Sequence, residues 1–124
     1  MRYNDIVMDH FDNPRNAGDL PGADAVGKAE NPVCMDRMTV ALRWDSATGR
    51  VAEARFRAEG CVPAMAAASA LTELLVGQDR AGLARINAEA VERALGGLPA
   101  TKKHAAHLAA DALANALSDP PAQE

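Results

Sequence analysis

The sequence has 124 residues and a mass of 13.0 kDa, the size of one ordinary domain. Apolar residues make up 48% and charged residues 24%, which excludes wholesale disorder. The formal charge is −4, with 13 basic and 17 acidic residues, and this argues against a nucleic-acid-binding protein, which needs a clustered basic surface. No apolar stretch approaches the roughly 20 residues of a membrane span, and the N-terminus lacks the apolar region of a signal peptide. We therefore expect a cytoplasmic protein that contacts no membrane.

The first third of the chain predicts a short helix followed by a long loop. The helix is expected over Tyr3–Phe11, with Asn4 as its N-cap and an end before Pro14, because the residue before a proline disfavours helix. Glycines and prolines are frequent over residues 17–33, which predicts a loop with one short edge strand near Ala25–Glu30.

The next segment has the period of two that is typical of half-buried strands. We expect one strand over Met38–Trp44, a turn over Asp45–Gly49 and a return strand over Val51–Ala58. In the return strand the alternation places Ala52 on the same face as Phe56, and Val51 on the opposite face.

The remainder of the chain predicts helices. A stripe of small and apolar residues runs from Pro63 to a stop at Gly77. Further helices are expected over Arg80–Arg85, Ala88–Leu95 and Lys102–Leu117, with a flexible tail over residues 119–124. Residues 1–118 are therefore expected to form a single α+β domain, in which several helices pack against a small antiparallel β-sheet of about three strands.

The residues able to bind a metal are few and lie at the ends of the expected elements. Cys34 precedes a strand, and Cys61 lies at a strand-to-helix junction, where helix amides favour the thiolate and should lower the thiol pKa. Asp36 is close to Cys34, and His104 and His107 are three residues apart on the last helix. Two thiols, a carboxylate and an imidazole suit zinc or iron.

Spacing alone leaves other interpretations open. Free cysteines often act as small buried apolar residues, and a disulfide between Cys34 and Cys61 would indicate redox sensing. On its own, Asp36 is more typical of a loop cap than of a ligand. His10 is more typical of a partly buried residue on the first helix than of a ligand.

Several motifs in one order resemble the IscU/NifU-type iron–sulfur cluster scaffold family. That family opens with Tyr-x₅-Asp-His-x₂-Asn-Pro-Arg-Asn and continues with Cys-Gly-Asp-x-Met. The matching segments, which extend over about residues 1–118, are Tyr3–Asn16, Cys34–Met38, Ala54–Phe56, Gly60–Cys61 and Leu98–His104.

The resemblance implies a sandwich fold of the SufE/NifU type and the assembly of a labile [2Fe–2S] cluster from sulfur supplied by a cysteine desulfurase. It also implies three cysteines and an aspartate as ligands, of which Cys34, Asp36 and Cys61 match. Thiolates are the ligands that such clusters need.

The sequence departs from the family pattern at two site positions. Ala105 stands where the third cysteine should follow His104, and Met35 replaces the glycine between Cys34 and Asp36. A chaperone-recognition segment of the form Leu-Pro-Pro-Val-Lys is present only in altered form, at Leu98–Lys102. His104 is then the best replacement ligand, ahead of His107.

We therefore expect a scaffold or carrier that binds a labile [2Fe–2S] cluster, iron, or Zn²⁺ in its place, through Cys34, Asp36, Cys61 and His104. Expected partners are a cysteine desulfurase, apo-protein acceptors and a chaperone, and the chain is expected to be a monomer or weak homo-oligomer. No nucleophile–base pair with an orienting group is evident, so an enzyme is not expected. The alternative is a relative that binds no cluster and acts as a desulfurase-interacting module or a thiol redox protein.

Overall fold

The computed structural model describes residues 2–118, so the expected tail at 119–124 lies outside the described residues. No helix among the described residues is long and apolar enough to cross a membrane. The elements follow one another as α1 (Asp5–Asp12), β1 (Ala25–Asn31), β2 (Asp36–Asp45), β3 (Arg50–Glu59), α2 (Val62–Leu75), α3 (Arg80–Ala84), α4 (Ala88–Ala94), the 3₁₀ turn η1 (Ala100–Lys102) and α5 (His104–Ser118).

The strands form one antiparallel sheet in the order β1-β2-β3. Asn31 pairs with Asp36 at the first turn, and Asp45 pairs with Arg50 at the second. The expected edge strand and hairpin are confirmed, with strands one to three residues longer than predicted. The α+β prediction, with a small antiparallel sheet and several helices, is likewise confirmed.

A β-bulge near the second turn reverses the predicted sides of the sheet for two side chains of β3. The register shifts between Arg43 and Trp44, so that Arg43 pairs with Glu53 while Trp44 pairs with Val51. Ala52 is the extra residue of β3. Val51 is therefore buried and Ala52 exposed, the reverse of the expectation, because an alternating sequence pattern does not reveal an inserted residue.

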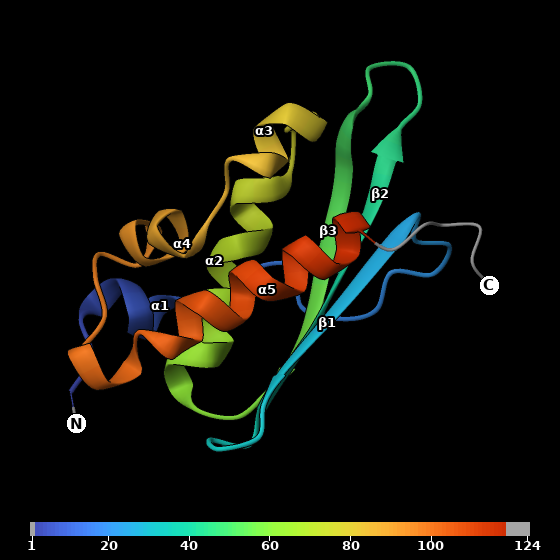
Figure 1. Ribbon diagram of the computed structural model, residues 1–124. Helices are drawn as coiled ribbons and strands as arrows, with labels where there is room; N and C mark the ends of the chain where they lie inside the picture. Colours follow the sequence, from blue (N-terminus) through green and yellow to red (C-terminus); the bar gives the residue numbers. More distant parts are fainter. Residues whose placement is uncertain (1, 119–124) are drawn as a thin grey trace.

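Helices α2 and α5 cover one face of the sheet, and α1 and α4 lie on the outer side of α2 (Figure 1). Alanine lines much of the interface, and this allows helix and sheet to approach closely. The closest approach is at Gly27 of β1, where an added Cβ would lie 2.0 Å from the carbonyl oxygen of Ala112 in α5. Backbone therefore packs directly on backbone between β1 and α5.

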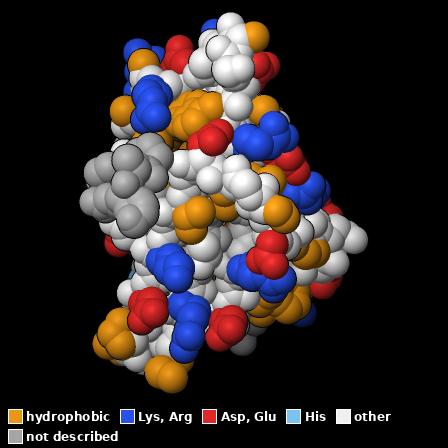
Figure 2. All heavy atoms as spheres, turned by 90° about the vertical axis from the view of Figure 1, so that its right-hand side faces the viewer, with side chains coloured by type: hydrophobic (Ala, Val, Ile, Leu, Met, Phe, Trp, Pro, Cys, Tyr) orange, Lys and Arg blue, Asp and Glu red, His pale blue; other side chains and the backbone are white. Residues whose placement is uncertain are grey.

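The opposite face of the sheet carries charged side chains in pairs. Glu53 bonds to Arg43 on the neighbouring strand and to Arg55, both at 2.7 Å, and Arg57 pairs with Asp19. Figure 2, which views the side of the molecule away from α1 and α4, shows Lys and Arg side chains interspersed with Asp and Glu. One face of this antiparallel sheet is therefore solvated, as the alternating pattern of its strands indicates.

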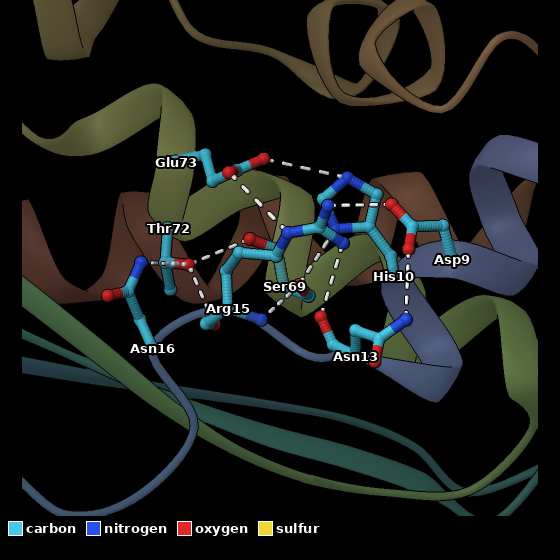
Figure 3. Close-up of polar contacts among 8 residues, drawn as sticks. All are labelled: Asp9, His10, Asn13, Arg15, Asn16, Ser69, Thr72 and Glu73. Atoms are coloured by element: carbon cyan, nitrogen blue, oxygen red, sulfur yellow. Dashed lines mark hydrogen bonds and ion pairs between the residues drawn. The ribbon is translucent and has the colours of Figure 1, made fainter.

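A buried polar network ties the segment after α1 to α2 (Figure 3). The Ser69 hydroxyl accepts a hydrogen bond from the Arg15 backbone N–H at 2.9 Å and lies 2.8 Å from Nδ1 of His10. The Thr72 hydroxyl donates to the Ser69 carbonyl at 2.7 Å and accepts from the Asn16 amide at 3.1 Å. Since these side chains meet only when α1 lies on α2, the network fixes the N-terminal segment in place.

Charged groups complete this network at its solvent side. Nη2 of Arg15 lies 2.6 Å from Oδ2 of Asp9, and its Nε lies 3.7 Å from Glu73. Nε2 of His10 faces the other oxygen of Glu73 at 3.6 Å. His10 is thus the partly buried helix residue that the sequence predicted.

This burial predicts how stability depends on pH. Desolvation lowers the pKa of His10 below its ordinary value, and Arg15 acts in the same direction, against the carboxylates of Glu73 and Asp9. The unfolded chain therefore binds a proton at His10 that the folded protein does not, so the free energy of unfolding should fall as the pH decreases below about 6.5.

Denaturant titrations at about pH 7.5 and about pH 5.5 measure this difference, because unperturbed carboxylates titrate below that window. A His10→Asn variant should lose most of the pH dependence. An equally steep decline in that variant would show that His10 is not its source.

Candidate functional site

Three chain segments meet at one end of the molecule. The β1–β2 turn, the start of α2 and the start of α5 lie together at the lower end of Figure 1. The turn holds Cys34, and β2 begins at Asp36. Cys61 is the N-cap of α2, and His104 is the first residue of α5. The fold therefore brings to one end residues that are up to 70 positions apart in the sequence.

Asp36 is the centre of this arrangement. Its side chain is buried, and its Oδ1 accepts a hydrogen bond from the Cys61 backbone N–H at 2.9 Å. Its Oδ2 lies 3.2 Å from Nε2 of His104 and 3.4 Å from Sγ of Cys61. A buried carboxylate needs such partners, because burial of an unpaired charge is costly. Asp36 is therefore fixed by both neighbouring segments.

Cys34 completes a group that could hold a metal ion. Its Sγ, a carboxylate oxygen of Asp36 and a ring nitrogen of His104 all lie within 4.8 Å of one another. Donors at about 2.0–2.3 Å from a tetrahedral zinc ion are about 3.3–3.8 Å apart, so these side chains would draw closer together on binding one ion. Thiolate, imidazole and carboxylate together suit zinc or iron. The donor set therefore fits a metal.

Cys61 approaches the group through Asp36 and lies outside the three mutually close donors. Burial is the largest effect and raises the pKa of its thiol; the Ala64 backbone N–H acts to lower it, and the carboxylate of Asp36 adds to the rise. The helix amide lowers this pKa as expected, but the expectation of a lowered thiol pKa was wrong, because desolvation and a neighbouring carboxylate outweigh that amide. Neither cysteine forms a disulfide.

The histidines of α5 have different surroundings. His104 is half-buried against Asp36, whereas His107, one turn further along the helix, is exposed and lies outside the group. Lys102 was not among the predicted site residues, yet its positive charge acts to lower the pKa of Cys61. Its place two residues before His104, at the end of the altered Leu98–Lys102 segment, is the sequence signal that could have indicated it.

Comparison with known proteins identifies the family. The family model described as "NifU-like N terminal domain" matches residues 2–124. The chain belongs to this family.

Curated relatives include two proteins named as iron–sulfur cluster assembly scaffolds. IscU 1 of Archaeoglobus fulgidus is 44% identical over 117 residues, which cover 94% of this chain and 75% of the relative. IscU of Aquifex aeolicus is 36% identical over 117 residues, which cover 94% and 74% respectively. The nitrogen fixation protein NifU of Cereibacter sphaeroides is 48% identical over 112 residues, 90% of this chain but only 45% of that protein.

Solved structures support the NifU-like fold. A putative scaffold protein for the SUF system from Fervidobacterium islandicum superposes with a TM-score of 0.76 at 20% identity, covering 94% of this chain and 96% of the other. The N-terminal part of a NifU-like protein from Brucella abortus gives a TM-score of 0.69 at 20% identity, with coverage of 92% and 90%. The predicted sandwich of the SufE/NifU type is confirmed as a NifU-like fold.

Two positions of this NifU-like chain depart from the motif pattern on which the sequence resemblance rests. Ala105, at the place of the third cysteine, is fully buried, so a packed methyl group stands where a thiol is expected. Met35, at the place of a glycine, has a φ of 59° and a side chain that is 73% exposed. The left-handed conformation suits glycine and is unfavourable for a long side chain. The turn thus has the left-handed backbone conformation that favours glycine, although methionine occupies the position.

Replacing Met35 by glycine should therefore stabilise the protein. The left-handed conformation costs free energy with methionine and little with glycine, and this gain should exceed the entropy that a glycine adds to the unfolded chain. The free energy of unfolding should therefore rise by up to about 1 kcal/mol. Little apolar contact is lost, because the Met35 side chain is exposed. Denaturant unfolding measures the change. Val33→Gly, in the same turn and without a positive φ, is the control and should give no gain; equal gains in both variants would contradict the explanation.

Proposed function

We propose that this NifU-like chain is a scaffold on which an iron–sulfur cluster is assembled and from which it is passed to apo-proteins. In this proposal Cys34, Asp36, Cys61 and His104 hold the iron, and a single domain of residues 1–118 supplies all four. The supporting relatives are named as scaffolds, which favours a carrier over a catalyst.

The observation that carries the proposal is the contact between the Asp36 carboxylate and two other donors. A buried carboxylate lies 3.2 Å from an imidazole and 3.4 Å from a thiol, with the Cys34 thiol in the same group. Iron or zinc would bind at these atoms with the thiol protons released to solvent, since the thiolate is the form that ligates. The four side chains come from three separate segments, so the folded protein is required for the site.

The donor set favours a cluster that is bound and then released. Thiolates are the strong ligands of iron–sulfur clusters, and this chain offers two of them. A carboxylate is harder and matches iron in a sulfide environment less well than a thiolate does. With His104 adjacent to the place of the missing thiol, we infer that the cluster is held by mixed ligands and exchanges readily. Zn²⁺ would occupy the same donors when iron and sulfide are absent.

Exposure of the two thiols differs and indicates where a partner approaches. Cys34 is exposed on its turn, whereas Cys61 is half-buried beside Asp36. A sulfur donor or an acceptor protein therefore reaches the site from the side of Cys34. We propose a cysteine desulfurase as the donor. Apo-proteins, with a chaperone that assists the transfer, would be the acceptors.

Anaerobic reconstitution with ferrous iron and sulfide tests this function. The wild type should acquire bound iron, bound sulfide and the visible absorption of a cluster. Cys34→Ala and Cys61→Ala should each lose most of the bound iron, because each removes one of two thiolates. Val33→Ala, beside Cys34 and 91% exposed, is the control and should behave as the wild type. Equal iron in all four proteins would refute cluster binding at this site.

Capture of a cysteine desulfurase by the immobilised protein addresses the partner separately. Retention of the desulfurase by a chain that never acquires iron would favour the second candidate function, an interaction module. The buried Ala105 is the observation that favours this second candidate, because it removes one thiol of the family pattern.

A further inference from the structure

Gly60 lies between the end of β3 and the N-cap of α2, in direct contact with Asp36. Its φ is +134°, a conformation that side-chain-bearing residues rarely adopt. A Cβ at this position would lie 2.0 Å from Oδ1 of Asp36, 2.8 Å from its Cγ and 2.9 Å from its Cα. The Asp36 carboxylate therefore occupies the space that any side chain at Gly60 would need.

The Asp36 carboxylate cannot move away from such a side chain without losing its present contacts. Asp36 is 1% exposed, and its Oδ1 is held by the Cys61 N–H at 2.9 Å. Its Oδ2 contacts His104 and Cys61. Rotation to avoid a Cβ at Gly60 would break the bond to Cys61 or turn Oδ2 away from the other donors. Close packing of this kind leaves no room for adjustment.

We propose that Gly60 is a positioning residue for the metal site: the absence of its side chain creates the seat that holds the Asp36 carboxylate toward Cys34, Cys61 and His104. Gly60 does not touch the metal and acts only through Asp36. This inference rests on the proposed function where metal affinity is concerned, while the seat itself is a property of the metal-free protein.

A matched pair of glycine variants tests the seat. Gly18 has a φ of +125°, close to that of Gly60, but an added Cβ there would meet no atom within 4 Å. Gly60→Ala and Gly18→Ala therefore carry a similar backbone cost, and only the first displaces the carboxylate. Two readouts apply: the affinity for Zn²⁺ by calorimetry, and hydrogen exchange of the Cys61 amide in the metal-free protein, since that amide donates to Asp36.

We expect Gly60→Ala to bind Zn²⁺ at least about 10-fold more weakly than the wild type, the lower end of losses for disturbed supporting residues. The Cys61 amide should exchange faster in the same variant. Gly18→Ala should match the wild type in both measurements. Unchanged affinity together with an unchanged Cys61 amide in Gly60→Ala would overturn the inference. If the wild type binds no Zn²⁺, the proposed function fails. The exchange rate of the Cys61 amide in Gly60→Ala then decides by itself whether Gly60 positions the Asp36 carboxylate.

A double variant covers the case in which Gly60→Ala does not fold. Of the three atoms nearest to the added Cβ, Asp36→Ala removes the two closest, Oδ1 and Cγ, and leaves the backbone α-carbon of residue 36 at 2.9 Å. If Gly60 acts through Asp36, the Gly60→Ala change should lower the thermal midpoint much less in the Asp36→Ala background than in the wild type. Equal losses in both backgrounds would contradict the proposal.

Discussion

Replacing His104 by alanine should weaken Zn²⁺ binding by more than about 100-fold, because loss of even an outer-shell partner commonly costs about 10–100-fold. The same replacement at His107 should leave the affinity unchanged. The two side chains lie one helical turn apart on α5, so both variants alter the helix similarly. Only the His104 ring contacts Asp36, at 3.2 Å, while His107 is exposed outside the group.

Calorimetric titration of the three proteins with Zn²⁺ measures the difference, and absorption of the Co²⁺-loaded proteins reports on ligand identity. Loss of the imidazole should also change the Co²⁺ spectrum, because a water or another donor then replaces a ring nitrogen. Equal affinities of His104→Ala and the wild type would remove His104 from the ligand set. A comparable loss in His107→Ala would indicate a different site.

The second large effect is expected from Gly27→Ala, through stability alone. Its Cβ would lie 2.0 Å from the carbonyl oxygen of Ala112 and 2.3 Å from the backbone nitrogen of Ala116. Backbone atoms of α5 have no rotamer by which to move aside, so the whole helix must shift. We expect a loss of at least about 3 kcal/mol, at the upper end of overpacking costs, and a thermal midpoint lower by about 10 °C or more.

Gly82→Ala is the matched control. Its Cβ would come nearly as close to another atom, 2.2 Å from Oε1 of Gln78, but that atom is the end of a flexible side chain. Gly82 lies inside α3, where alanine is favoured over glycine by up to about 1 kcal/mol. Thermal and denaturant unfolding should therefore show no loss at Gly82. A tolerated Gly27→Ala would contradict the close packing of α5 on β1.

The helices and strands of this fold follow from local sequence patterns. Which of their side chains face the core follows from those patterns only in part. The alternation around Phe56 correctly predicts which β3 side chains face the core, going back along the strand as far as Glu53. It then fails at Ala52, since a bulge depends on how β2 and β3 pair and leaves no mark in the sequence of one strand. The α1 N-cap at Asn4 is local chemistry and is confirmed by its bond to the Val7 N–H.

The site was only partly predictable for a similar reason. Spacing placed His104 and His107 on one helix face without choosing between them, and the resemblance of the motif favoured His104. That Cys34 and His104 meet depends on how α5 packs against β1 and β2. The raised pKa of Cys61 depends on burial and on Asp36, neither of which is visible at a helix start in the sequence.

X-ray absorption at the iron edge of the reconstituted protein tests the central claim most directly. The proposal predicts iron-to-iron scattering from a cluster, a sulfur shell, and a nitrogen or oxygen shell from His104 and Asp36. In His104→Ala the imidazole contribution to that shell should be lost, while in His107→Ala it should remain. Iron without iron-to-iron scattering, or a wild-type spectrum identical to that of His104→Ala, would contradict cluster assembly on this mixed set of ligands.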